Sequence, residues 1–245
     1  LRLQSRRDRR SAEAAARNRE GLDPAFTLSL EGVHGMSTWY TLAERADAYV
    51  LGLVDEAERK AFLFTNIVNA QGRKYDIPVV VGALAANREI YSVGMGSSVE
   101  EIQARWDRAI ANPIAPQMVD NAECQEVVHE GADLLGEGKG LDMLPIPIST
   151  PGFDSAPTLT ATNVITVDPV TGVQNMGTYR CALKAPDRMV VRMATRVGGA
   201  GGYLHYQAWK KAGHKTMPCA VVLGCPPYVA FMGPQKLPIG MDEFD

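Results

Sequence analysis

The sequence lacks the features that a membrane span, a zinc finger or a disulfide scaffold requires. No stretch approaches the roughly 18 consecutive apolar residues of a membrane-spanning helix. The cysteines form no C-x-x-C pair, and the histidines never fall at zinc-finger spacing. We therefore expect Cys124, Cys181, Cys219 and Cys225 to be reduced, half-buried apolar side chains, since none lies in a recognisable nucleophile turn.

A strong charge of either sign is also missing. The formal net charge of -3 and the pI near 5.9 give no electrostatic footprint for nucleic acid. A basic cluster at the amino end is interrupted by acidic residues and is typical of a solvated helical arm or packing extension; it contains Arg2, Arg6, Arg7, Arg9 and Arg10. Because no apolar stretch follows it, no secretory signal is indicated, and we expect a cytoplasmic protein with no nucleic-acid or membrane partner.

What is present is the composition of a globular chain. Its 245 residues, 46% of them hydrophobic and 22% charged, are enough to bury the core of one large or two modest domains. The sequence starts at Leu1 instead of a methionine, and Asp245 follows an acidic pair with no closing element. We expect the gene product to continue beyond both ends.

Residues 1–112 are predicted to form an amino-terminal α+β domain with a helical arm. Helix composition or apolar spacing predicts helices over residues 2–19, 42–60 and 100–110. Strands are predicted at 61–66 and 77–82, separated by a turn at 71–74, and a glycine-rich turn follows Asp76-Ile77-Pro78.

Residues 113–245 change to short strand-like runs separated by proline and glycine. We predict strands at 124–128, 158–167, 177–183, 189–193 and 219–223, with a proline-stiffened loop over 141–154. The run Asp168-Pro169-Val170-Thr171-Gly172 predicts a hairpin turn. Several short strands at this spacing favour a sandwich or a barrel.

The hairpin turn is followed by two polar residues, Asn175 and Arg180, five positions apart. Arg180 lies in the predicted strand at 177–183, and Asn175 lies just before it. Amide and carboxylate oxygens are hard ligands that suit Mg²⁺ or Mn²⁺. Taken alone, Asn175 is compatible with a turn residue, Glu243 with a solvated carboxylate, and Arg180 with an edge-strand arginine whose head lies in water.

Three segments together carry a family resemblance. They are Asn175-Met176-Gly177-Thr178-Tyr179-Arg180, the run from Met217 to Pro227 with its Gly224-Cys225-Pro226-Pro227 ending, and Pro238-Ile239-Gly240-Met241-Asp242-Glu243. The chain resembles the UbiD family of reversible decarboxylases, over roughly residues 60–245, and is similar to its aromatic-acid branch. The resemblance implies a split β-barrel, of the flavin-reductase type, over residues 113–245. It also implies that this barrel is incomplete at the carboxyl end.

The resemblance also implies the site. The cofactor would be prenylated FMN, with Mn²⁺ or Mg²⁺ held by Asn175 and Glu243, and K⁺ at further ion-holding positions, namely Met176, Gly233 and Gln235. Arg180 would be the catalytic group that faces the substrate carboxylate. The implied cofactor-binding residues are Asn175, Gly177, Thr178, Tyr179, Arg180, Gly233, Pro234, Gln235 and Glu243. Gln235 is equally compatible with a hydrogen-bonding role in a core turn.

Two departures from the family pattern stand out. The family's third metal ligand is a histidine, and the corresponding loop from Thr195 to Gly202 contains none. His205 lies one turn later and is compatible with either a substitute ligand or a surface histidine. The family's acidic pair and phosphate-binding lysine would lie beyond Asp245, and without them we expect no turnover. The run Gly198 to Gly202 lacks the Lys-Ser/Thr of a P-loop and is interpreted as a mobile flap beside the cofactor.

The sequence thus predicts reversible, non-oxidative decarboxylation of an aromatic or conjugated acid by prenylated FMN. A flavin prenyltransferase would supply the cofactor, and a homo-oligomer, a dimer or hexamer, is expected. Two alternatives stay open: an FMN-dependent reductase on a related barrel, and a non-catalytic subunit of a hetero-oligomeric decarboxylase.

Overall fold

The computed structural model describes residues 26–29, 61–69, 72–84, 86–148, 155–195, 198–238 and 240–245. The helices predicted over residues 2–19 and 42–60 lie outside these ranges. Within the described part, no helix combines the length and the apolar character needed to cross a membrane. The helices and strands present there form an α+β fold, as the sequence predicts.

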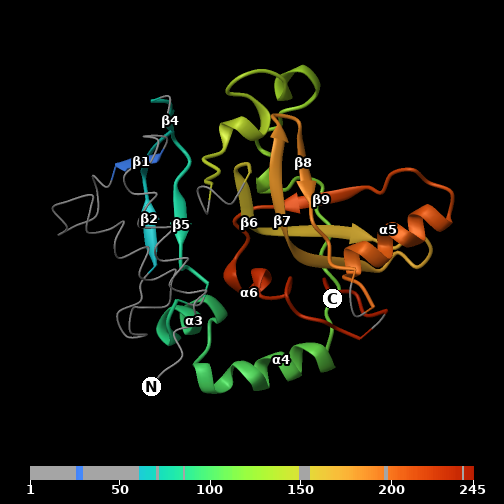
Figure 1. Cartoon of the computed structure of the whole chain (residues 1–245). Helices are drawn as coiled ribbons and strands as arrows, with labels where there is room; N and C mark the ends of the chain where they lie inside the picture. The colour runs from blue at the N-terminus through green and yellow to red at the C-terminus, as the bar shows by residue number, and fades with distance from the viewer. Residues whose placement is uncertain are drawn as a thin grey trace, which may run out of the picture.

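Two small antiparallel sheets make up the first part of the described chain (Figure 1). One has the order β1-β3-β4, formed by Phe26–Ser29, Asn66–Asn69 and Lys74–Tyr75, and the other pairs β2, Phe62–Phe64, with β5, Val79–Val81. The strand predicted at 61–66 is therefore wrong in one respect, because the chain changes sheets at Thr65. The predicted turn is confirmed at its described end, where the Gly72 N–H donates to the Asn69 carbonyl at 2.9 Å.

Helix α3, Arg88–Met95, occupies the stretch that the sequence predicts only as a glycine-rich turn. Its start is fixed by Asn87, whose side chain accepts a hydrogen bond from the Ile90 N–H at 2.8 Å. Its end is fixed by Gly96, which adopts the left-handed conformation at φ 61°. The helix predicted at 100–110 is confirmed as a 3-10 turn, η2 at Val99–Glu101, that continues into α4, Ile102–Ala111.

The strand predicted at 124–128 is wrong. This region contains a 3-10 turn, η3 at Glu123–Gln125, and Val127 and Val128 remain 71% and 65% exposed. A β-branched pair forms a strand only where a neighbouring strand supplies hydrogen bonds, and none of the described strands pairs here. Two further 3-10 turns follow, η4 at Gly131–Leu134 and η5 at Gly140–Met143.

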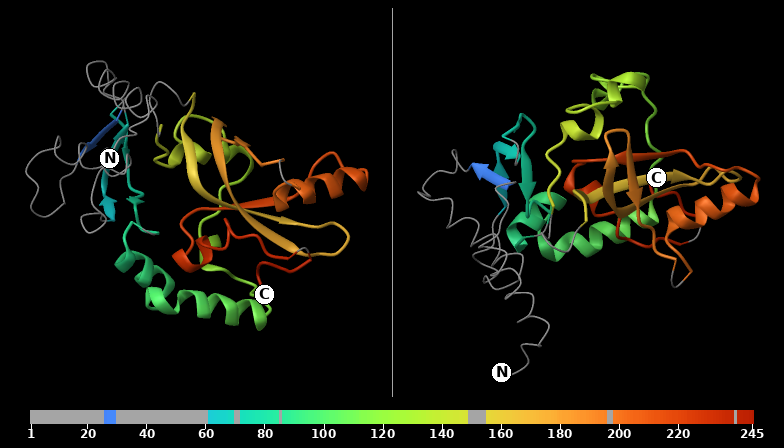
Figure 2. Two further views of the ribbon diagram at one scale, coloured as in Figure 1. Left: turned by 60° about the horizontal axis from the view of Figure 1, so that its bottom comes forward. Right: turned by 45° about the horizontal axis from the view of Figure 1, so that its top comes forward.

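The second part of the chain is built on a four-stranded antiparallel sheet of order β8-β7-β6-β9. These strands are Arg188–Val191, Gln174–Ala185, Thr158–Val167 and Cys219–Val222, close to the predicted bounds. Val164 in β6 is fully buried, and the sheet curves strongly in the views of Figure 2. The described strands form an open sheet, so a split barrel stays a prediction.

The hairpin turn between β6 and β7 is confirmed. The strands pair up to Val167 and Gln174, and the Asp168 carboxylate accepts the N–H groups of Val170 at 2.8 Å and Thr171 at 2.9 Å. Gly172 then takes a positive φ of 77°, which L-residues with a side chain rarely adopt. This turn fixes the register of Asn175 opposite Thr166.

Two helices lie against the sheet (Figure 1). Helix α5, Gly201–Lys211, is tied to β6 by Trp209, whose indole N–H donates to the Val167 carbonyl at 2.8 Å. Helix α6, Pro227–Ala230, follows β9 and contacts α3, where the rings of Tyr91 and Phe231 meet edge to face at 4.9 Å. The second contact joins the two parts of the described chain.

Candidate active site with a flavin-sized cavity

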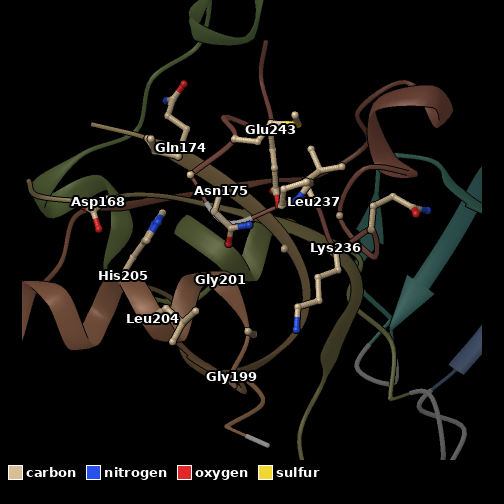
Figure 3. A pocket seen from close by; sticks show the side chains of 18 of the residues that line it. Asp168, Gln174, Asn175, Gly199, Gly201, Leu204, His205, Lys236, Leu237 and Glu243 are labelled. Atoms are coloured by element: carbon tan, nitrogen blue, oxygen red, sulfur yellow. The ribbon is translucent and has the colours of Figure 1, made fainter. Parts of the chain in front are cut away.

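A cavity of about 430 Å³ opens where β7, the start of α5 and the segment after α6 converge (Figure 3). One wall is the β6–β7 turn and the beginning of β7. A second wall is the chain from Gly199 to His205, and a third runs from Gly233 to Glu243. Cofactor pockets are typically clefts of roughly 300–1,000 Å³, so this cavity is of the right size for a flavin-scale ligand.

Asn175 and Glu243, 68 residues apart in the sequence, lie together in this cavity. The segment that carries Glu243 runs along the start of β7, where the Asp242 carboxylate accepts the Gln174 N–H at 2.8 Å. The Glu243 carboxylate itself accepts the backbone N–H of Met176. Figure 3 shows the side chains of Asn175 and Glu243 pointing into the same space.

The side-chain oxygen of Asn175 is buried and has no hydrogen-bond partner among the described residues. An unpaired buried amide oxygen costs free energy, because its bond to water is lost without replacement. Such an atom is well suited to a cation ligand, and the neighbouring Glu243 supplies a second oxygen donor.

Burial raises the pKa of the Glu243 carboxyl above its usual 4.5. Hydrogen bonds from the Met176 N–H and the Asn175 side chain act in the opposite direction, and the nearby charge of Asp242 raises the pKa further. The raised pKa means that this site disfavours an isolated negative charge. A bound cation would reverse that preference.

Three glycines in the cavity wall are packed closely against neighbouring side chains, and a side chain at any of them would collide with those neighbours. A Cβ on Gly177 would stand 2.1 Å from the Tyr179 ring, one on Gly201 would stand 2.3 Å from the Asn175 oxygen, and one on Gly233 would stand 2.1 Å from Oγ1 of Thr178. These positions therefore require glycine for close approach.

The interpretation of Gly198 to Gly202 as a flap needs correction. Gly201 and Gly202 form the first turn of α5, and the Gly202 N–H donates to the Tyr179 hydroxyl oxygen at 3.2 Å. Burial is the main cause that raises the pKa of Tyr179. These two glycines serve tight packing against Asn175 and Tyr179, and neither is placed as a hinge in an open loop.

The start of α5 also shapes the electrostatics of the cavity. Its N-cap residue, Ala200, has no side chain that could accept a hydrogen bond, and in the first turn the Tyr179 hydroxyl accepts the Gly202 N–H. Gly199, Ala200 and Gly201 line the cavity. The helix dipole makes such an end attractive to an anion, as a flavin phosphate is.

His205 lines the cavity and is not a free surface histidine. Its Nδ1 lies 2.9 Å from Oγ1 of the buried Thr166, and desolvation lowers its pKa although the nearby Asp168 raises it. Among the described residues, no group of three His, Cys, Asp or Glu side chains is arranged to hold a metal. His205 therefore does not complete a metal cluster with Glu243 in this arrangement.

The remaining predicted residues divide between two sides of β7. Gly177 and Tyr179 line the cavity with Asn175, and Gly233, Pro234 and Gln235 line it from the segment after α6. Met176 is buried, whereas Thr178 and Arg180 are exposed and do not line this cavity. Successive side chains of a strand point to opposite faces, which separates Arg180 from the Asn175 set.

Sequence reasoning named no site role for several cavity residues, namely Asp168, Lys236, Leu237 and Met241. Lys236 is the one with a readable signal, since it is a positively charged residue directly after Gln235, a predicted site residue. The others become site residues only through the folding of the chain.

The described residues thus place a cavity with paired oxygen donors and glycine-bearing walls beside a curved antiparallel sheet. Residues 117–245 match the family UbiD, described as the 3-octaprenyl-4-hydroxybenzoate carboxy-lyase Rift-related domain. Because that match covers more than half of the chain, the protein belongs to the UbiD family.

Solved structures agree with this assignment. The UbiD-class enzyme HmfF from Pelotomaculum thermopropionicum in complex with FMN is 31% identical, with a TM-score of 0.59 over 69% of this chain and 36% of that one. An evolved dimeric form of HmfF in complex with prFMN is 29% identical, with a TM-score of 0.55 over 69% of this chain and 37% of that one.

Vanillic acid decarboxylase from Sedimentibacter hydroxybenzoicus, in open form, is 19% identical to this chain, with a TM-score of 0.56. The match covers 84% of this chain and 39% of the decarboxylase chain. At this identity the likeness concerns the fold alone. The chain spans little more than a third of the length of these structures.

Proposed function

We propose that this chain supplies the flavin and cation site of a decarboxylase that acts on an aromatic or conjugated carboxylic acid. The observation that carries the proposal is the buried, unpartnered oxygen of Asn175 beside the half-buried Glu243 carboxylate. This pair sits in a cavity that is also lined by the start of α5, the positive end of the helix dipole. A cation and a phosphate together would satisfy all three features.

The cation is Mn²⁺ or Mg²⁺, because both donors are hard oxygens. Asn175 and Glu243 hold it, and its charge offsets the burial that raises the pKa of Glu243. Met176, Gly233 and Gln235 are proposed to hold K⁺. Gly233 and Gln235 line the same cavity as Glu243, and the Met176 N–H donates to the Glu243 carboxylate.

Prenylated FMN is the proposed cofactor, and the residues present fit a flavin. Gly177 and Gly233 line the cavity with backbone alone and let Tyr179 and Thr178 pack close to them, while Tyr179, Pro234 and Gln235 border the same space. When bound, this cofactor acts as the electron sink for loss of CO₂. The chain's own contribution is to place the flavin, hold its phosphate and exclude water.

Arg180 and Thr178 are proposed to act from the other side of β7. Arg180 is an exposed residue of β7, the strand that also carries Asn175, Gly177 and Tyr179. Its guanidinium can therefore bind a carboxylate through two parallel hydrogen bonds. Residues 113–245 form the proposed flavin-binding domain, and residues 1–112 a separate domain that packs on it through α3 and α6. A homo-oligomer and a flavin prenyltransferase that supplies the cofactor are part of the same proposal.

The test is to express the chain with and without a flavin prenyltransferase and to measure its absorbance, its bound flavin by mass spectrometry and its metal content. We expect a flavin and one divalent ion per chain, and loss of both in Glu243→Ala. Ser97→Ala, an exposed change on another element, is the matched control. A wild-type protein that binds neither FMN nor prenylated FMN, with Mn²⁺ and K⁺ supplied, would overturn the proposal. Bleaching of bound FMN by NADH or NADPH would favour a reductase instead.

A further inference from the structure

Asn163 is a polar residue in an unfavourable place. It lies in the middle of β6, between β7 and β9, and is only 2% exposed. Asparagine is disfavoured in strands, and a buried amide is costly unless both of its ends are paired. The contacts of this side chain therefore indicate what it does for the fold around it.

Both ends of the Asn163 amide are used. Its nitrogen donates to Sγ of Cys225 at 2.7 Å, and its oxygen accepts the Thr178 hydroxyl at 3.1 Å. The Thr178 N–H in turn donates to the Gly233 carbonyl at 3.2 Å. A Cβ on Gly233 would stand 2.8 Å from the Asn163 oxygen, so the glycine backbone lies directly against this amide.

Cys225 and Gly233 are the two ends of one excursion of the chain. After β9 the chain leaves the sheet at Cys225, forms α6, and returns to β7 at Gly233. The segment that follows, Gly233 to Pro238, is a wall of the cavity. The far side of the excursion packs on α3, where the ring of Phe231 meets Tyr91.

We propose that Asn163 is a positioning residue that clamps both ends of the Cys225–Gly233 excursion and thereby sets the wall of the flavin cavity. This inference rests on the proposed flavin site. Asn163 does not line the cavity itself and acts through Cys225, Thr178 and Gly233. Without the amide, the Cys225 end loses its hydrogen bond to the sheet. The Gly233 end keeps its backbone bond to Thr178 but loses the amide that packs against it and that accepts the Thr178 hydroxyl.

If Asn163 only stabilised the core, a different experimental result would be expected. Loss of any buried polar group in β6 would then lower the melting temperature, and flavin affinity would change only through the small unfolded population. Thr162 is the matched control, because it is fully buried in the same strand and its hydroxyl donates to the Tyr179 carbonyl. It makes no contact with the excursion among the hydrogen bonds of the described residues.

The experiment compares Asn163→Ala and Thr162→Ala in two measurements. The first is FMN affinity with Mn²⁺, from quenching of flavin fluorescence well below the melting temperature. The second is the alkylation rate of Cys225 relative to the exposed Cys219 in the same sample, resolved by peptide mass spectrometry. The second measurement reads the clamp directly and needs no flavin.

For Asn163→Ala we expect FMN affinity to fall about tenfold, the scale of one lost buried hydrogen bond, and Cys225 to react several times faster. Thr162→Ala should stay within about twofold of wild type in both measurements. Equal losses in the two variants, or unchanged Cys225 reactivity in Asn163→Ala, would overturn the proposal.

If Asn163→Ala does not fold, Thr178→Val removes the bond to the Asn163 oxygen from an exposed position and is expected to weaken FMN binding. Unchanged affinity in that variant would then count against the clamp. A wild-type protein that binds no FMN would refute the flavin site, and Cys225 labelling would still decide on the clamp.

Discussion

Replacing Gly201 with alanine adds one methyl group at the point where α5 meets β7. The new Cβ would stand 2.3 Å from Oδ1, 2.4 Å from Cγ and 2.6 Å from Nδ2 of Asn175, closer than non-bonded carbon atoms approach. Backbone conformation is no obstacle, since Gly201 is the first residue of a helix. The Asn175 side chain must therefore turn away.

The effect on stability is expected to be small because two terms oppose each other. Alanine is better than glycine in a helix by about 0.8–1 kcal/mol. Turning Asn175 away loses its hydrogen bond to Glu243, about 0.5–1.5 kcal/mol, although the side chain has the cavity to move into. The melting temperature should therefore shift by no more than roughly 4 °C.

The effect on the site is expected to be much larger. The contact between the Asn175 oxygen and a bound cation is expected to contribute about 1.5–3 kcal/mol to binding, which corresponds to roughly 10- to 150-fold in affinity. Gly201→Ala should thus weaken Mn²⁺-dependent FMN binding at least tenfold, measured by fluorescence quenching and calorimetry.

Gly202→Ala is the matched control for this prediction. It lies in the same helical turn, and its Cβ would meet the flexible end of Met193 and the edge of the Tyr179 ring at 3.2 Å. No atom of Asn175 is among the three nearest to that Cβ. We expect it to bind FMN within a few-fold of wild type. Wild-type affinity in Gly201→Ala would refute the role given to Asn175.

Three further changes test other parts of the structure. Burial raises the pKa of Glu243, so the metal-free protein loses stability as the pH rises from about 4.5 through the raised pKa. Glu243→Gln, which stays neutral, should therefore melt at a higher temperature than wild type at pH 7 and at the same temperature at pH 4. A lower melting temperature of the variant at pH 7 would contradict this reasoning. Arg180→Ala, made in the expected longer gene product that carries the acidic pair and the lysine, should keep its flavin and melting temperature while turnover falls at least about 100-fold. Normal turnover would show that Arg180 is not needed for chemistry. Trp209→Phe should lower the melting temperature by about 2–8 °C, since the Val167 carbonyl loses its indole donor, and an unchanged melt would mean that water replaces that bond.

Much of the fold around the site was predictable because its signals are local. The turn residues from Asp168 to Gly172 specify a hairpin, and the bounds of β6 follow from a run rich in β-branched residues. The juxtaposition of Asn175 and Glu243 was predictable only through family resemblance, because no local pattern links residues 68 apart. The structure brings them together because the carboxylates of Asp242 and Glu243 accept the backbone N–H groups of Gln174 and Met176 in β7.

Other features depend on tertiary contacts that a single sequence does not encode visibly. The pair Val127-Val128 has strand propensity but no neighbouring strand, so propensity alone misleads there. Helix α3 is short, and its glycine hides its apolar spacing, although Asn87 and Gly96 are readable cap signals. The glycines at 201 and 202 read as a flexible loop until the side chains packed against them are known.

Because alternate residues of β7 serve opposite sides of the strand, the two halves of the proposed chemistry are separable by substitution. A change at Arg180 leaves the wall formed by Asn175 and Gly177 in place, so selectivity for the acid can diverge among related proteins while the cofactor is retained. An insertion or deletion of one residue in this strand does the opposite. It exchanges the two sets of side chains at once and places the arginine among the ion-holding groups. The length of β7 is therefore expected to vary far less than its composition.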